Sequence, residues 1–450
     1  MNARLFITAG AIALALGGCS KAIISPDKQI GPNPVLPAPH QFLLPPMGIA
    51  HPVGWKNGAM PSVPAGFTIA PFASDLKSPR RVLGLPNGDV LVVESGGPGL
   101  DGVSRPKDIV FGIVIGKAHG PGKPGNEVVL LRDTDGDGKA DMRKVLADKL
   151  DSPFGIVVHG GYLYVAETGA ILRWPYNPGD TALGPKVRLA DLPKGAIDHH
   201  WTKDLAISPD GSMLYAGVGS NSNIVENGLE AEEGRAAIWQ VHAEDGAKRL
   251  YATGLRNPNG LTFNPTSGQL WAVVNERDEL GNDLVPDYMT SVKPGAFYGW
   301  PWSYYGQHVD KRVHPGRPDM VAKAIPPDYA LSSHVAALGL IFENGSGFPA
   351  AYKGGAFVGE HGSWDRQVPN GYRVVFVPFA GGTPAGKAQV FVGGFIGKGH
   401  DTFGRPVGLS FDSTGALLVA DDVGNVIWRV TANAPAVAAK PAAVPAPKAG

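Results

Sequence analysis

The chain has 450 residues, of which 43% are hydrophobic, so it can build one large or two or three average domains around a sizeable core. Lysine plus arginine equals aspartate plus glutamate at 40 each, a balance that gives no sign of a nucleic-acid or other polyanionic partner. The 62 glycines and 41 prolines interrupt short runs rich in Val, Leu and Tyr, and this composition favours β structure.

The first residues, MNARLFITAGAIALALGGCS, combine a basic start with an apolar stretch that is short for a bilayer span. They predict a signal peptide over residues 1–18. Cys19 is the only cysteine, and Leu16-Gly17-Gly18-Cys19 resembles a bacterial lipobox, so we expect a lipid-modified N-terminus at Cys19. Ser20 resembles the outer-membrane sorting pattern, which predicts a periplasm-facing, lipid-anchored protein. The alternative is a plain secretory signal with an incidental cysteine.

Two flanking segments cannot build a core by themselves. Residues 19–59 are Pro-rich and predict a lipidated N-terminus followed by an extended tether. Residues 433–450 are a low-complexity Ala/Pro/Lys tail that we expect to be disordered. The predicted folded body is therefore residues 60–432.

One pattern recurs six times in this body: a polar or Pro-containing start, a short apolar strand, a turn rich in Gly, Asn, Asp or Ser, and a second apolar strand. This is the sequence form of a β-hairpin. Six copies predict an all-β, six-bladed β-propeller, with insertions such as residues 283–335 in its loops. A many-stranded β-sandwich is the alternative, but it does not predict six copies of one motif. The copies lie at residues 78–95, 152–168, 200–218, 256–274, 335–360 and 405–421.

The residues just before each first strand are candidates for a site, because in a propeller that strand lies nearest the axis. His200 stands five residues before Leu205, and Arg256 stands five before Leu261. Asn257 and Arg405 stand four before the corresponding leucines of the fourth and sixth copies. A lone histidine is usually a surface residue, so His199 and His334 are weaker candidates than His200.

The segment DTDGDGKAD contains alternating carboxylates, which suit one hard cation. It predicts a structural calcium loop that caps a hairpin, formed by Asp133, Asp135, Asp137 and Asp141. Lys144 stands where an EF-hand has its final glutamate, and no helix pair flanks the loop. The alternative is a solvated acidic turn.

Four motifs resemble the sorbosone dehydrogenase family, whose relatives include soluble quinoprotein glucose dehydrogenase. They are HWTKDLAISPDG, GLRNPNGLTFNPTSGQLWAVVNERDELGNDLVPDY, FYGWPW and EHGSWDRQVPNGYRVV, and the resemblance covers essentially the whole body. It implies a six-bladed propeller that binds pyrroloquinoline quinone (PQQ) and calcium. It also implies oxidation of a sugar, sugar aldehyde or polyol, with electrons passing to a separate acceptor, a cytochrome or the quinone pool.

The resemblance also implies roles for individual residues. His200 matches the base that takes the hydroxyl proton, and Arg256, Asn257 and Arg405 match contacts to the cofactor. Arg366 is a cofactor candidate by position, and the calcium-bearing segment falls on Glu276 and Arg277.

The sequence departs from the glucose enzymes at two of these places. Their aspartate immediately before the histidine is His199 here, with Asp198 one residue further back. Their second arginine, two residues past the one matched by Arg405, is Val407.

Two other functions remain open on the same fold. A calcium-dependent lactonase or other hydrolase needs carboxylates and asparagines around the axis rather than the arginine pair. A non-catalytic propeller that binds a glycan or a protein partner depends on loop aromatics such as Trp300 and Trp302.

Overall fold

The computed structural model describes residues 24–42, 47–98, 123–195, 198–345 and 347–433. The predicted signal peptide, Cys19 and all but the first residue of the predicted tail lie outside the described residues. Within these ranges no helix combines the length and the apolar character that a bilayer crossing requires.

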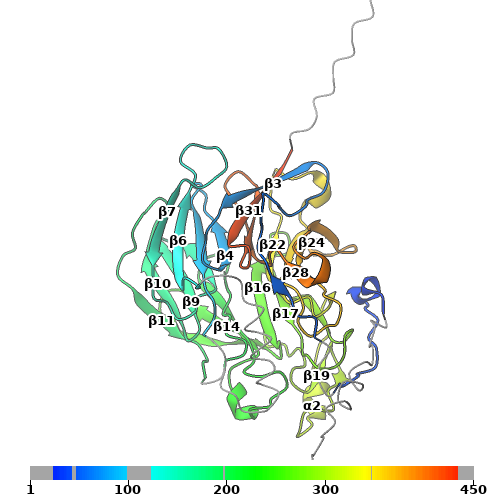
Figure 1. Ribbon diagram of the computed structural model, residues 1–450. Coiled ribbons are helices and arrows are strands. Elements are labelled where there is room, and N and C mark those ends of the chain that lie inside the picture. The colour runs from blue at the N-terminus through cyan, green and yellow to red at the C-terminus, as the bar shows by residue number, and fades with distance from the viewer. Residues whose placement is uncertain (1–23, 43–46, 99–122, 196–197, 346, 434–450) are drawn as a thin grey trace, which may run out of the picture.

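Six antiparallel sheets form a closed ring, which confirms the all-β, six-bladed propeller (Figure 1). Each predicted hairpin supplies the first two strands of one blade. The six first strands contact one another in the order β4, β8, β12, β16, β22 and β29, and β29 returns to β4. A sandwich of two sheets has no such circular order.

The blades have the following strands in order from the axis outward. Blade 1 has β4 (Pro79–Gly84), β5 (Val90–Glu94), β6 (Glu127–Arg132) and β7 (Met142–Ala147). Blade 2 has β8 (Ile156–His159), β9 (Tyr162–Glu167), β10 (Ala170–Pro175) and β11 (Val187–Asp191). Blade 3 has β12 (Leu205–Ile207), β13 (Met213–Val218), β14 (Ala237–His242) and β15 (Lys248–Thr253).

Blade 4 has β16 (Asn257–Phe263), β17 (Leu270–Asn275), β18 (Pro286–Ser291), β21 (Tyr329–Ser333) and the short β1 (Ile30–Gly31). Blade 5 has β22 (Ala337–Phe342), β23 (Ala356–Glu360), β24 (Arg373–Val377) and β27 (Gln389–Val392). Blade 6 has β29 (Pro406–Phe411), β30 (Leu417–Asp421), β31 (Val426–Ala432) and β3 (Phe67–Ala73).

The remaining described elements are short. They are the strand pairs β2 (His51–Pro52) with β28 (Asp401–Thr402), β19 (Ser303–Tyr304) with β20 (His308–Val309), and β25 (Phe379–Ala380) with β26 (Thr383–Pro384). The helical turns are η1 (Pro26–Gln29), η2 (Leu229–Glu232), α2 (Pro318–Val321), η3 (Ala350–Tyr352) and η4 (Lys398–His400).

The core lies between neighbouring blades, and strand alternation explains how one strand serves two interfaces. Leu91 and Val93 of β5 pack in a cluster with blade 2, whereas Val90 and Val92 pack in a cluster with blade 6. Successive side chains of a strand point to opposite faces, and each face of a blade meets a different neighbour. This is why the inner strands read as continuous apolar runs.

An N-terminal strand closes the ring. β3 pairs with β31, the third strand of blade 6, so the last blade contains both ends of the folded body. Trp55 and Trp428 strengthen this closure, because the ring nitrogens of both bond to Asp421 Oδ2, at 2.7 and 3.1 Å. The two indole rings lie edge to face at 5.4 Å.

Two segments differ from the expectation. Residues 283–335 are only partly an insertion, because β18 and β21 within them complete blade 4. Only the stretch between these two strands, with β19, β20 and α2, is additional to a four-stranded blade. The described part of the predicted tether packs on the blades: β1 pairs with β21, and the buried Gln29 donates a hydrogen bond to the carbonyl of Asp283.

Removing the closure tryptophan tests how much the closure stabilises the ring. We expect Trp428→Ala to reduce the free energy of unfolding by about 3–5 kcal/mol, because the ring is 2% exposed and leaves a large cavity. The control Val390→Ala, at a side chain 54% exposed, is expected to change it by less than about 0.5 kcal/mol. Equal denaturation midpoints for the two variants would contradict this account.

Candidate functional site

An apolar plug lies on the propeller axis. Phe154, Leu338 and Val407 form one buried cluster, with Trp201 packed against it. These residues come from the first strands, or the residues just before them, of four different blades. Val407 therefore occupies an axial position where an arginine would bring a charge into an apolar layer.

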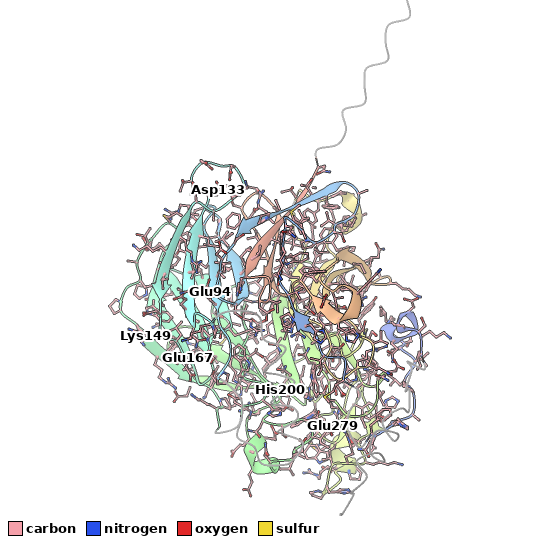
Figure 2. All side chains as sticks on the ribbon, in the orientation of Figure 1. Glu94, Asp133, Lys149, Glu167, His200 and Glu279 are labelled. Carbon is pink, nitrogen blue, oxygen red and sulfur yellow. The ribbon has the colours of Figure 1, made fainter. Side chains whose placement is uncertain are left out.

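His200 precedes the first strand of blade 3 and lies near one end of the propeller (Figure 2), and contacts with Ser220 hold its ring in one orientation. Its Nδ1 lies 2.9 Å from both the carbonyl oxygen and the Oγ of Ser220. Ser220 Oγ donates its own hydrogen to the carbonyl of Ser222, so both Ser220 oxygens accept at Nδ1. The hydrogen of the neutral ring is therefore on Nδ1, and the Nε2 lone pair is the one that can accept a proton.

Burial lowers the pKa of His200 well below 6.5, and the positive charge of Arg256 lowers it further. The imidazole is accordingly neutral at pH 7. The neighbouring His199 has an exposed side chain, and its ring centroid lies 6.3 Å from that of His200. Of the two histidines, His200 is the one built into the mouth.

The Gly219-Ser220 segment brings His200 and the start of blade 4 together. Ser220 N–H donates to the carbonyl of Arg256 at 2.7 Å. A Cβ on Gly219 would lie 2.4 Å from His200 Cβ and 2.6 Å from Asn257 Oδ1, so a residue without a side chain is required there. The predicted proximity of His200, Arg256 and Asn257 is thus a property of this backbone segment.

Arg256 is held by protein groups on several sides. Its Nη2 lies 2.9 Å from both Asp278 Oδ2 and Asn223 Oδ1, and its Nη1 donates to the Glu276 carbonyl at 2.6 Å. Trp300 is buried and donates to the Asn223 carbonyl at 2.9 Å, which supports this arrangement rather than offering a free ring face.

Arg405 has a different environment. Its guanidinium is buried and contacts only neutral groups, the carbonyls of His361 and Gly362 and the hydroxyl of Tyr372, at 3.2–3.4 Å. Within the part of the chain that the structure describes, it forms no ion pair and its Nη1 has no hydrogen-bond partner. A buried cation with neutral partners favours an anionic ligand. Arg366, by contrast, is paired with Asp283 at 3.0 Å.

A second histidine faces the same mouth from blade 5. His361 Nε2 lies 3.0 Å from Asp422 Oδ2, and Arg80 Nη1 lies 2.8 Å from the same oxygen. Burial lowers the pKa of His361 to about 4, although Asp422 favours the charged form. Arg80 lies 5.7 Å from the Trp201 ring, so these groups continue around the rim to the residue that follows His200.

His334 lies on the other side of Arg256, among carboxylates. Its Nδ1 is 3.6 Å from Asp278 Oδ1, and its Nε2 is 3.0 Å from the Gly281 carbonyl. Burial opposes the imidazolium, yet the hydrogen bond to Asp278 and the charge of Asp365 raise the pKa of His334 to about 9. Burial raises the pKa of Asp365 to about 7.

The structure separates the two groups of predicted calcium ligands. Asp133, Asp135 and Asp137 gather in the β6–β7 turn, with oxygens within 4.8 Å of one another. Asp141 instead binds the N–H and hydroxyl of Thr134. Figure 2 shows Asp133 at the opposite end of the propeller from His200, so this loop cannot contribute to the mouth.

Glu276 and Arg277 form a buried ion pair at 3.0 Å, and Arg277 also pairs with Asp310 at 3.1 Å. The Glu276 carbonyl accepts a hydrogen bond from Arg256 Nη1 at 2.6 Å and keeps a second lone pair. Glu276 Oε1 is buried and has no hydrogen-bond partner among the described residues, so calcium at Glu276 and Arg277 stays a prediction.

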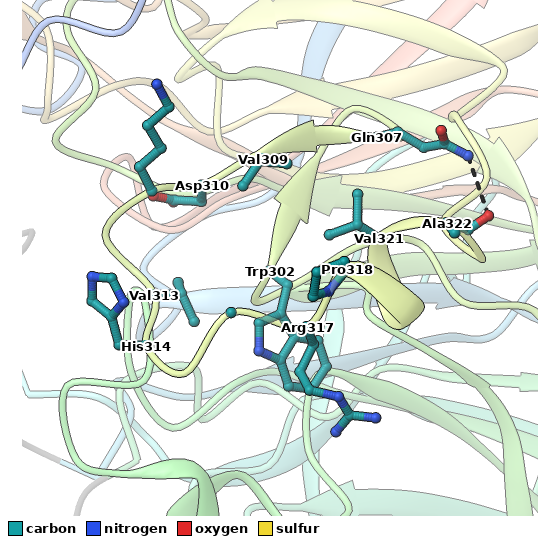
Figure 3. A pocket seen from close by; sticks show the side chains of 12 residues that line it. Trp302, Gln307, Val309, Asp310, Val313, His314, Arg317, Pro318, Val321 and Ala322 are labelled. Carbon is teal, nitrogen blue, oxygen red and sulfur yellow. Dashed lines mark hydrogen bonds between the residues drawn. The ribbon is translucent and has the colours of Figure 1, made fainter.

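Trp302 lines a pocket of about 440 Å³ in the segment between β18 and β21, together with Val309, His314 and Arg317 (Figure 3). The Arg317 guanidinium lies over the Trp302 ring at 5.5 Å. One face of the indole is therefore already covered.

Sequence reasoning missed Ser220 and Asp422, and it placed Asp278, His361 and Asp365 only within the two loops that follow the fourth and fifth hairpins, without a role for any of them. Most of them follow the second strand of a hairpin rather than precede the first. In an antiparallel hairpin the end of the second strand lies beside the start of the first, so this sequence position was an available signal.

Comparison with protein-family models gives two matches. Residues 62–363 match the model described as Domain of unknown function (DUF7133), and residues 318–433 match one described as TrAA12-like.

Two curated proteins show sequence similarity. An uncharacterized protein of Borreliella burgdorferi is 30% identical over 241 residues, which are 53% of this chain and 62% of that protein. A pyrroloquinoline quinone-dependent pyranose dehydrogenase of Coprinopsis cinerea is 25% identical over 370 residues, covering 70% of this chain and 44% of that protein. The chain thus spans less than two thirds of the length of either relative.

Among the solved structures that share the fold, two illustrate the likeness. The holo form of the C. cinerea pyranose dehydrogenase PQQ domain has a TM-score of 0.66 at 20% identity and covers 85% of this chain and 100% of that one. A calcium structure of a Trichoderma reesei carbohydrate-active enzyme of family AA12 has a TM-score of 0.67 at 20% identity and covers 84% and 100%.

The protonation state of His200 can be observed directly. We expect nitrogen NMR of labelled histidine to show the His200 ring neutral at pH 7, with its hydrogen on Nδ1, because Ser220 offers two acceptors there. His200→Gln assigns the signal by removing it. A ring that carries its hydrogen on Nε2, or that titrates at or above pH 6.5, would contradict the geometry.

Proposed function

We propose that this chain, which belongs to the DUF7133 family, is a PQQ-dependent dehydrogenase that oxidises a sugar, sugar aldehyde or polyol. The C. cinerea relative supports the cofactor and substrate class by its name, and the shared propeller supports the scaffold. The observation that carries the proposal is the pairing, at one mouth, of a neutral histidine with an available Nε2 and a buried arginine that forms no direct ion pair among the described residues.

The residues at the mouth fit the quinone cofactor. PQQ carries carboxylates and carbonyls, and Arg405 offers a buried guanidinium whose Nη1 is available within the described residues. Asn257 donates from Nδ2 to Asn275 Oδ1 at 3.2 Å, and its Oδ1 lies on the side of His200. Its amide is therefore next to the histidine at the mouth. Arg256 would act with its orientation already set by Asp278. Arg366 is the weakest of the predicted contacts because Asp283 neutralises it.

When bound, PQQ supplies a two-electron acceptor for the hydride that leaves the substrate carbon. His200 Nε2 takes the proton of the substrate hydroxyl, and Ser220 keeps the ring in place. Burial and Arg256 disfavour the resulting imidazolium, so the proton is released readily after the step. The plug of Phe154, Leu338 and Val407 limits water access from the axis.

Calcium belongs to the proposal as a companion of the quinone, supported by the calcium structure from T. reesei. Glu276, whose buried Oε1 has no hydrogen-bond partner among the described residues, is the residue of the predicted segment that would hold the ion. The lipobox pattern at Cys19 supports a lipid-anchored, periplasm-facing location, from which electrons pass to a cytochrome or to the quinone pool. The resemblance to the sorbosone dehydrogenase family supports a sugar or sugar aldehyde as the substrate.

Cofactor binding can be measured without any substrate. We expect PQQ to quench tryptophan fluorescence of the full chain, and Arg405→Gln to weaken binding tenfold or more, since a hydrogen bond to a charged group contributes about 1.5–3 kcal/mol. Arg429→Gln is the matched control, because Arg429 of β31 pairs with Asp412, away from the mouth. Lack of PQQ binding by the unaltered chain would refute the proposal, and lactone hydrolysis and glycan binding would be tested next.

The role of His200 as the base can be tested by measuring the rate of substrate oxidation. We expect His200→Gln to reduce dye-linked oxidation by roughly 10²–10⁴-fold while leaving PQQ affinity nearly unchanged. Because the pKa of His200 lies well below 6.5, the acidic limb of the pH–rate profile is expected to begin only below about pH 6.5. A variant that retains full turnover over a panel of aldoses, ketoaldehydes and polyols would exclude His200 as the base.

A further inference from the structure

Three side chains from separate loops converge next to Arg256. Asp278 follows β17, His334 precedes β22 and Asp365 follows β23. One carboxylate oxygen of each aspartate and one ring nitrogen of the histidine all lie within 4.8 Å of one another. His334 and Asp365 are buried, so the cluster is an interior feature and not a solvated acidic surface.

In His334 and in Asp278, one of the two polar side-chain atoms is already held by a protein group, and the other faces the cluster. His334 Nε2 lies 3.0 Å from the Gly281 carbonyl and donates its hydrogen there, so Nδ1, on the Asp278 side, is the nitrogen that a metal ion would bind in place of a proton. Asp278 Oδ2 is bound by Arg256 at 2.9 Å. A histidine that gives its other N–H to a carbonyl is the usual arrangement of a metal-ligating imidazole.

Asp365 provides an independent observation. Its Oδ2 accepts the Glu279 N–H at 2.7 Å, whereas its Oδ1 is buried and has no hydrogen-bond partner among the described residues. The residue is 1% exposed. A buried carboxylate oxygen without a partner is costly, and a bound cation removes that cost.

We propose that Asp278, His334 and Asp365 bind one divalent transition-metal ion, Zn²⁺ or Mn²⁺. Two carboxylates and one imidazole suit such ions, whereas calcium prefers an all-oxygen shell. This metal differs in chemical class from the calcium proposed to accompany the quinone, and in place from the Asp133 loop at the far end of the propeller.

The site would also position a residue of the mouth. Asp278 bridges the two, because Oδ1 faces His334 while Oδ2 holds the Arg256 guanidinium. A metal bound through Oδ1 therefore fixes the carboxylate that orients Arg256. Only this consequence rests on the proposed function, since metal binding itself needs no quinone.

The test uses the full chain, stripped with a chelator and free of PQQ. Calorimetric titrations with Zn²⁺, Mn²⁺, Ca²⁺ and Mg²⁺ measure the affinity and stoichiometry of each ion alone. We expect one site for Zn²⁺ or Mn²⁺ that is weakened at least tenfold in His334→Gln and in Asp365→Asn. The matched control His242→Gln, at a half-buried histidine 3.0 Å from Asp245, is expected to bind as the unaltered chain does.

X-ray absorption of the metal-loaded, unaltered chain gives a second readout that does not depend on how the variants fold. We expect one imidazole nitrogen and several oxygens in the first coordination shell. The proposal is overturned if neither Zn²⁺ nor Mn²⁺ binds, if only calcium binds, if both variants bind normally, or if the spectrum lacks an imidazole. Because PQQ is absent throughout, these outcomes are separate from success or failure of the dehydrogenase proposal.

Discussion

Each sheet of this protein has two apolar faces, and both have to be covered. Leu91 and Val93 of β5 face blade 2, while Val90 and Val92 face blade 6, so no blade can be stable with only one neighbour. A closed ring satisfies this requirement for every blade at once. The pairing of β3 with β31 completes the ring, and the two tryptophans bound to Asp421 pack against that pairing.

The ring determines where polar groups can be placed. Because the six first strands meet at the axis, residues at their starts share one mouth, and the second strands return their ends to the same edge. The axial plug of Phe154, Leu338 and Val407 lies on the same inner strands. Charged groups of this mouth are therefore partly desolvated, which is why the pKa values of His200 and His361 are lowered by burial before any ligand arrives.

Charge compensation divides the mouth into distinct parts. Arg256 is neutralised by Asp278, and Arg80 shares Asp422 with His361. Arg405 alone among these three arginines forms no ion pair within the described residues, so it is the most suitable group for an anionic ligand. The carboxylates gathered at His334 have the opposite character and suit a cation. The mouth thus combines an arginine without an ion pair, a cluster of carboxylates and a neutral histidine.

The fold was largely predictable because it repeats. Alternating apolar residues and Gly-rich turns identify the six hairpins, and the number of hairpins is the number of blades. Residues 283–335 were harder to interpret, because β18 and β21 are separated by the segment that contains α2 and only pairing with β17 identifies β18 as a blade strand.

For the site, the sequence determined which residues stand before the first strands, so His200, Arg256 and Arg405 could be named by register alone. It could not determine which partners neutralise them. Asp278 bonds to Arg256 across 22 residues within the β16–β17 hairpin. His361 of blade 5 bonds to Asp422 of blade 6 across 61 residues, a contact that forms only when neighbouring blades pack. The same applies to the convergence of Asp278, His334 and Asp365. Local pattern specifies a strand and its ends, whereas the distance between the ends of different strands is decided by closure of the ring.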